Sequence, residues 1–77
     1  MDKKFEFEVV EHIAALSDED SIILTELNIV KWGNAEPKYD IRHWRLNAFK
    51  ENTPYKGISL SAGELRELKA ALNNMEI

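Results

Sequence analysis

Cationic and aromatic side chains are interleaved between Lys38 and Trp44, where the sequence reads Lys-Tyr-Asp-Ile-Arg-His-Trp. Side chains on a β-strand point alternately to the two faces of a sheet. A strand here would carry two cations, one acid and an indole ring on one face, namely Lys38, Asp40, Arg42 and Trp44. Such a face suits single-stranded nucleic acid, because ammonium and guanidinium groups bind phosphates while an aromatic ring stacks a base.

Asp40 lies between the two cations of this face, and we expect it to have a structural role. A carboxylate directed at a phosphate would repel it, whereas a carboxylate beside Arg42 orients the guanidinium or binds a backbone group. An exposed ion pair contributes only about 0–1 kcal/mol to stability. A gain in stability therefore does not explain why two cations occur on this face. We interpret Lys38 and Arg42 as phosphate contacts.

The charge of the chain is unevenly distributed. The net charge of the 77 residues is −4, which by itself opposes binding to nucleic acid. Residues 1–30 hold two Lys against eight Asp or Glu, whereas residues 31–56 hold six Lys or Arg against three Asp or Glu. The local distribution of charge decides which surface attracts a charged partner. The middle third, which also contains both Trp residues, is therefore the candidate binding region.

The length of the chain is enough for one domain, so we expect residues 1–77 to form a single domain. A core of this size gives limited stability, and there is no Cys to form a disulfide. His12 and His43 are far apart and lack the spacing of metal ligands, so no metal or other cofactor is expected. Self-association is the remaining source of stability, and we expect a homodimer.

Membrane association is not expected. No apolar run approaches the roughly 20 residues needed to cross a bilayer. The charged residues 1–8 lack the uninterrupted apolar stretch of a signal peptide. The interpretation is a soluble, cytoplasmic protein without a membrane partner.

The hydrophobic pattern predicts four strands and a helix. Alternation of apolar and polar residues indicates strands over residues 5–16, 22–32 and 38–46. The alternation slips at Val9 and Val10, which predicts a bulge there. A polar loop over residues 47–56 then leads to a short fourth strand over residues 57–60.

A helix is predicted from the capping box of Ser61 and Glu64 to about Asn73. Its apolar stripe consists of Leu65, Leu68, Leu72 and Met75. The expected fold is α+β, a curved antiparallel sheet with the helix over the face that carries Leu27, Ile29, Ile41 and Ile58. The open face would then carry Trp32, Lys38, Arg42, Trp44 and Ser59. Two further cations are expected to flank it from strand ends, Lys31 and Lys56.

Two segments carry a resemblance to a known family. Residues 31–44 read Lys-Trp-Gly-Asn-Ala-Glu-Pro-Lys-Tyr-Asp-Ile-Arg-His-Trp, and residues 56–61 read Lys-Gly-Ile-Ser-Leu-Ser before the amphipathic helix. In this order and spacing, they resemble the transcriptional positive cofactor 4 family, most closely its small bacterial members. The resemblance covers most of the chain. The sequence lacks the long Ser-rich and Lys-rich N-terminal extension of the eukaryotic members, so coactivator behaviour that depends on that extension is not expected.

This resemblance implies a fold, a partner and a set of site residues. The fold is a curved four-stranded sheet with one helix, paired as a homodimer. The partner is single-stranded DNA, bound with little sequence preference through aromatic and basic residues of the sheet. By position, the implied binding residues are Lys31, Trp32, Lys38, Arg42, Trp44 and Lys56. Transcription, replication and repair all stay open as the process served.

Two other functions stay open at this stage. The same face would serve an RNA-binding module, because stacking and phosphate contacts do not distinguish RNA from DNA. The acidic first third is compatible with a protein-interaction domain that engages the transcription machinery. An enzyme is not expected, since no nucleophile has an adjacent base and the three Gly form no phosphate-binding loop. No small-molecule substrate is expected either.

Overall fold

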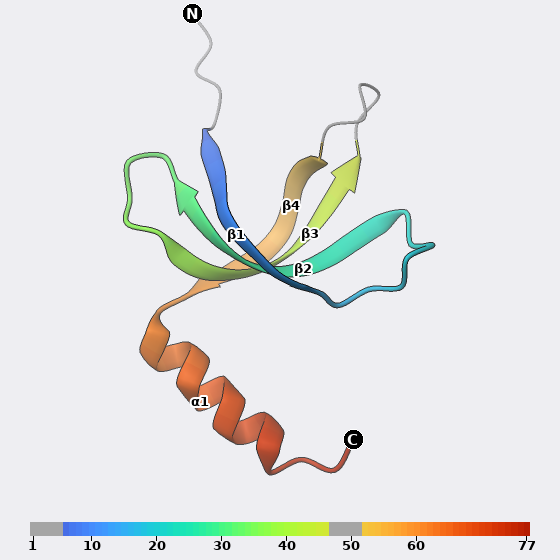
Figure 1. The fold of residues 1–77 in the computed structure, drawn as a ribbon, viewed down its shortest axis with the longest axis vertical. Helices are drawn as coiled ribbons and strands as arrows, with labels where there is room; N and C mark the ends of the chain where they lie inside the picture. The colour runs from blue at the N-terminus through green and yellow to red at the C-terminus, as the bar shows by residue number, and fades with distance from the viewer. Residues whose placement is uncertain (1–5, 47–51) are drawn as a thin grey trace, which may run out of the picture.

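The computed structural model describes residues 6–46 and 52–77. Within these ranges the chain forms four strands and a helix (Figure 1), namely β1 (Phe7–Ala15), β2 (Ile23–Trp32), β3 (Lys38–Leu46), β4 (Asn52–Leu60) and α1 (Ala62–Asn73). The strands follow one another as antiparallel neighbours in one sheet. The predicted α+β class, a four-stranded antiparallel sheet followed by a helix, is confirmed, and β3 has the predicted bounds.

Two β-bulges bend β1. Val9 lies opposite Val30 and Glu11 lies opposite Ile29, so Val10 is an extra residue on β1. The bulge predicted near Val9 and Val10 is therefore confirmed. Ile13 is extra in the same way, because its neighbours His12 and Ala14 lie opposite consecutive residues of β2. Each bulge increases the local twist of the strand, and so the sheet curls along β1.

The fourth strand is longer than the sequence pattern predicted. Residues 52–56, expected in a loop, are part of β4, whereas the rest of that predicted loop, residues 47–51, lies outside the described residues. The pattern missed this part of the strand because Pro54 lacks a donor N–H group, and a proline therefore argues against a strand. As β4 is an edge strand, one side of its backbone needs no partner, and a proline is tolerated there.

A bulge also interrupts the pairing of β4 with β3. Arg42 lies opposite Gly57 and Trp44 lies opposite Pro54. Two residues of β4, Tyr55 and Lys56, therefore lie opposite the single residue His43. The bulge turns both side chains toward the side of the sheet that His43 faces.

The sheet curls strongly toward one face. Phe7 lies opposite Trp32, whereas Trp44 lies opposite Leu24 at the other end of β2. The ring centroid of Phe7 is nevertheless 5.6 Å from that of Trp32 and 5.5 Å from that of Trp44. We call this side the concave face and the opposite side the outer face. Every buried residue in the described ranges lies on the concave face, namely Asn28, Val30, Asp40 and Trp44.

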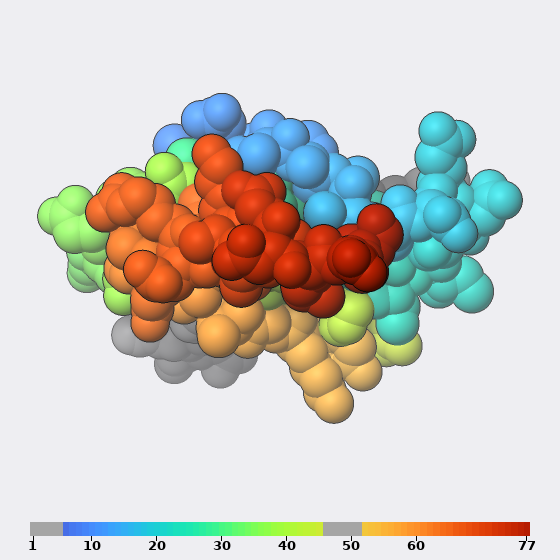
Figure 2. Space-filling view, turned by 90° about the horizontal axis from the view of Figure 1, so that it is seen from below, coloured from blue at the N-terminus to red at the C-terminus, as the bar shows by residue number. Residues whose placement is uncertain are grey.

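The helix begins as predicted but does not cover the sheet as predicted. The Ser61 side chain accepts from the Glu64 N–H, and the Glu64 side chain accepts from the Ser61 N–H, which confirms the capping box. From the end of β4, α1 runs on the outer side of the sheet and away from it (Figure 1). Seen from the helix side, it crosses the middle of the molecule with β1 and β4 visible beyond its two flanks (Figure 2).

The apolar stripe of the helix is only partly covered, with Leu65 and Leu68 half-buried and Leu72 and Met75 exposed, which corrects the predicted position of the core. No described residue of α1 is buried, and Ile58 on the outer face is 56% exposed. The remaining outer-face residues of that prediction, Leu27, Ile29 and Ile41, are only half-buried. The physical reason is the curl of the sheet, which lets side chains of the concave face bury one another. No helix in the described ranges is long and apolar enough to cross a membrane.

Gly57 is predicted to be indispensable for the β3–β4 pairing. A Cβ atom at this position would lie 2.5 Å from the Ile41 carbonyl oxygen and 2.6 Å from the Arg42 Cα. We expect Gly57→Ala to lower the free energy of unfolding by about 2 kcal/mol, as overpacking does, measured by urea denaturation. Gly63→Ala is the matched control, because the nearest atom to its Cβ would be 3.9 Å away. Equal stability of the two variants would contradict the close approach at Gly57.

Candidate nucleic-acid interface

A fully buried carboxylate organises the concave face. Asp40 in β3 has no exposed surface. Its Oδ2 accepts hydrogen bonds from Trp32 Nε1 at 3.2 Å and from Ser59 Oγ at 2.9 Å. Arg42 donates to both carboxylate oxygens, from Nε to Oδ1 at 2.9 Å and from Nη2 to Oδ2 at 2.8 Å. The predicted structural role of Asp40 in orienting Arg42 is confirmed.

The guanidinium of Arg42 is stacked over Trp32. Its Cζ atom lies 4.6 Å from the centroid of the Trp32 ring, which is within the range of a cation–π contact. The Arg42 side chain is only 15% exposed, and its charge faces the buried Asp40 carboxylate. The two planar groups thus form one rigid unit, the Trp32–Arg42 stack, whose position depends on Asp40.

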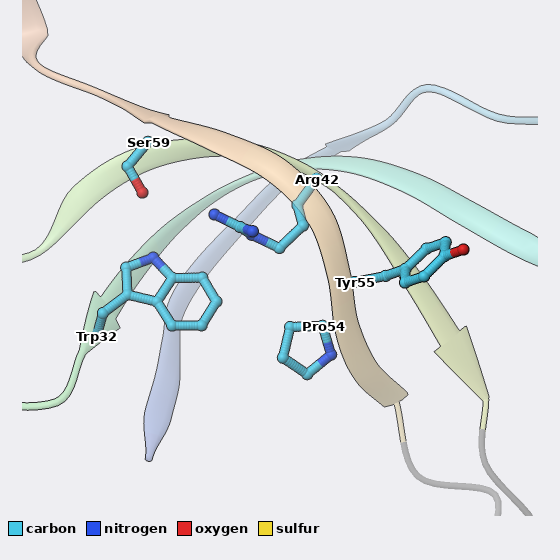
Figure 3. A pocket seen from close by; sticks show the side chains of 5 residues that line it. All are labelled: Trp32, Arg42, Pro54, Tyr55 and Ser59. Carbon is cyan, nitrogen blue, oxygen red and sulfur yellow. The ribbon is translucent and has the colours of Figure 1, made fainter. Parts of the chain in front are cut away.

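An open hollow of about 410 Å³ lies beside this stack. Its lining residues come from three strands and are Trp32, Arg42, Pro54, Tyr55 and Ser59. The guanidinium of Arg42 points toward the indole of Trp32, with the Ser59 hydroxyl directed to the same side (Figure 3). Ligand sites combine apolar walls with a few fixed polar groups. This hollow has an indole and a proline ring as walls and a guanidinium and a hydroxyl as polar groups.

Trp44 lies on the predicted face, but the expectation that its ring is open to a ligand is wrong. The residue is 2% exposed and packs against Phe7. Its Nε1 donor has no hydrogen-bond partner within the described residues. Because the curl of the sheet closes over this ring, Trp44 acts as the core of the concave face in this conformation. Trp32, which is half-buried, is the indole that borders the hollow.

A second polar network on the concave face escaped the sequence analysis. Asn28 is fully buried. Its Oδ1 lies 2.6 Å from His12 Nδ1, and its Nδ2 donates to Glu26 Oε1 at 3.1 Å. Polar Glu26 and Asn28 alternate with apolar residues along β2, and this alternation was the available signal. In residues 6–46 and 52–77, no group of three or more His, Asp or Glu is placed to hold a metal ion.

The three predicted lysine contacts do not converge on the hollow. Lys38 is exposed at the start of β3, on the concave side by alternation with Asp40. Lys31 lies opposite Glu8 and therefore faces the outer side. Lys56 belongs to the β4 bulge and lies near Tyr55, with its Nζ 5.9 Å from the ring centroid. The structure thus brings together Trp32, Arg42 and Ser59, with Lys38 on the same face.

Loss of the Asp40 charge is predicted to destabilise the fold. Asp40→Asn keeps the shape of the side chain but leaves the Arg42 guanidinium without its buried counter-ion. Breaking a buried ion pair is strongly unfavourable, so we expect the free energy of unfolding in urea to fall by about 3 kcal/mol. Glu36→Gln, at an exposed acid, should change it by less than about 0.5 kcal/mol. A loss of under about 1 kcal/mol for Asp40→Asn would contradict the organising role of the carboxylate.

Comparisons with known proteins do not identify a family for this chain, so a function is argued from the residues of the concave face. A scan against protein-family models found no match, and a search of curated proteins also found none.

Proposed function

We propose that this chain is a single-stranded DNA-binding protein of the transcriptional positive cofactor 4 type, with little sequence preference. The observation that carries the proposal is the Trp32–Arg42 stack, fixed by buried Asp40 at the edge of an open hollow. Flat groups of this kind accept any base, because every base has a π-face. The proposal includes cytoplasmic localisation and service in transcription, replication or repair.

In this mechanism, Arg42 and Lys38 have different tasks. The Arg42 charge is balanced by Asp40 and is 15% exposed, so Arg42 contributes a planar surface and hydrogen-bond donors at the hollow. Lys38 is exposed and is in no ion pair within the described residues. Lys38 is therefore the better candidate on this face for binding a phosphate and releasing a counterion.

We predict that Trp32→Leu and Lys38→Gln weaken binding of oligo-dT in different ways. Loss of the stacking surface should reduce affinity by about 5- to 100-fold, since stacking contributes about 1–3 kcal/mol per base. Lys38→Gln should reduce the slope of log affinity against log salt by about 0.7, the value for one phosphate contact on a single strand. Fluorescence anisotropy at two salt concentrations measures both, with circular dichroism to verify folding.

Lys69→Gln, at an exposed position of α1, is the matched control and should bind like the unaltered chain. Wild-type affinity and wild-type salt slope for both test variants would refute the concave face as the binding surface. The same titration with oligo-rU and with duplex DNA separates the alternatives. Equal binding of RNA would leave DNA specificity unsupported, because only contacts to the 2′-hydroxyl distinguish the two strands.

The proposal includes a homodimer, and the exposed apolar residues of the helix and the outer face support it. Leu72 near the end of α1 is 46% exposed, Met75 just after the helix is 52% exposed, and Ile58 on the outer face is 56% exposed. Burial of apolar surface contributes about 25 cal/mol per Å², and a small chain without disulfides depends on it. A second copy that packs its helix and outer face against these residues would bury them.

We predict that Leu72→Glu converts the dimer to a monomer. A charge introduced into the apolar stripe would be buried without a partner at the interface, which is strongly unfavourable. Ala70→Glu is the matched control. At 100° per residue, position 70 lies about 200° around the helix from Leu68 of the stripe, so the same charge is on the opposite side of α1 and should leave the dimer intact. Sedimentation equilibrium at micromolar concentration measures both. A monomeric wild-type chain, or dissociation by Ala70→Glu alone, would contradict a dimer formed through this stripe.

A further inference from the structure

The β4 bulge creates a second surface of aromatic and cationic groups, outside the concave face. Tyr55 at the bulge is 46% exposed. Arg45 Cζ lies 5.5 Å and Lys56 Nζ lies 5.9 Å from the centroid of its ring. The ring centroid of His43 lies 6.4 Å from it. We call these four residues the Tyr55 surface.

Neighbouring strands hold this surface in place. His43 lies opposite Thr25 of β2, and its Nδ1 is 2.8 Å from the Thr25 hydroxyl oxygen. Alternation along β3 directs Arg45 to the same side as His43. The extra residue in β4 adds Tyr55 and Lys56 to that side. His43 and Arg45 therefore start from residues paired with β2, and Tyr55 and Lys56 start from a bulge that is held between the paired residues Pro54 and Gly57.

The charges of the Tyr55 surface are in no ion pair with an acid of the described residues. Within residues 6–46 and 52–77, Arg42 and His12 are the groups that lie within ion-pair distance of a carboxylate. Neither Arg45 nor Lys56 does so, and both side chains are exposed. This distinguishes them from Arg42, whose charge faces buried Asp40. No acid of the described residues thus competes with an anion for Arg45 and Lys56.

The Tyr55 surface continues from the concave hollow across the edge of the sheet. Tyr55 also lines the hollow that contains Trp32 and Arg42. Its ring lies on the other side of β4 from Trp32 and Pro54 and points away from them (Figure 3). A second hollow, of about 240 Å³, shares His43 and Lys56 with this surface, and the rest of its lining is Thr25, Ile41, Arg42 and Gly57.

We infer that the Tyr55 surface is a second contact for the same single strand of nucleic acid. Tyr55 stacks a base, and Arg45 and Lys56 bind the phosphates beside it. The strand passes from the Trp32–Arg42 stack over edge strand β4 to the outer face. An exposed ring flanked by exposed cations is the combination that single-strand binding uses. This inference rests on the proposed function of the concave face and extends it to Tyr55 and Arg45, together with Lys56, which the family resemblance already implied.

Length-dependent binding tests this inference. Oligo-dT strands of roughly 4 to 24 nucleotides cover the known range of site sizes for one binding domain. The wild-type chain should gain affinity again once the strand is long enough to reach Tyr55. Tyr55→Leu should abolish that second gain, with about a 5- to 100-fold loss on long strands and a smaller loss on short ones, because Tyr55 also lines the concave hollow. Tyr55→Phe keeps the ring and should bind like wild type at every length.

The outcomes separate this inference from the proposed function. Wild-type binding by Tyr55→Leu at all lengths would overturn the second contact and leave the concave face untouched. An equal loss of binding by Tyr55→Leu at all lengths, with no effect of Trp32→Leu, would refute the concave face and would also overturn the inferred two-contact path, because the Tyr55 surface would then bind the strand by itself. Arg45→Gln and Lys56→Gln should each reduce the salt slope by about 0.7 on long strands only.

A measurement on the unaltered chain avoids any effect of substitution on folding. Tetranitromethane modifies exposed tyrosines, and the sequence contains two, Tyr39 and Tyr55. A long oligo-dT should protect Tyr55 from nitration, as read by mass spectrometry of tryptic peptides, whereas a short one should not. Unchanged nitration of Tyr55 in the presence of saturating long strand would overturn the inference. Tyr39, which is half-buried, serves as the internal reference.

Discussion

The structure depends on how a buried carboxylate is satisfied. An ionised group removed from water costs several kcal/mol unless hydrogen bonds and an opposite charge compensate it. Asp40 receives donors from β2, β3 and β4, namely Trp32, Arg42 and Ser59. These donors are compatible only with one register of the three strands. The interaction that positions the Trp32–Arg42 stack is therefore the same one that favours the observed register of β2, β3 and β4.

That curl decides where the apolar residues find cover. Side chains of the concave face bury one another, with Phe7 in contact with both indoles. Side chains of the outer face cannot bury one another, because on the convex side of a curled sheet they point apart. The helix also leaves this face partly uncovered. A chain with a polar network in its core and leucines on its surface has a reason to self-associate. The proposed dimer follows from this distribution.

Much of the fold was predictable because it depends on local rules. Alternation located β3, the slip at Val9 and Val10 located a bulge, and Ser61 with Glu64 located the helix start. The burial of Trp44 was not predictable, because alternation assigns a residue to a face but does not say how strongly the sheet curls. The role of Tyr55 was not predictable for two reasons. A proline argues against a strand at the start of β4, and the bulge changes which face the following residues occupy.

The division of charge across β4 gives the proposed binding its salt dependence. A cation contributes to counterion release only if it exchanges its ions for a phosphate. Arg42 already has Asp40 as its counter-ion, so its loss would change stacking far more than the response to salt. Arg45 and Lys56 have no carboxylate within ion-pair distance in the described chain and would change that response. In the proposed binding, the net acidity of the chain is no obstacle, because the cations that would attract phosphates, Lys38, Arg45 and Lys56, are in no ion pair within the described residues.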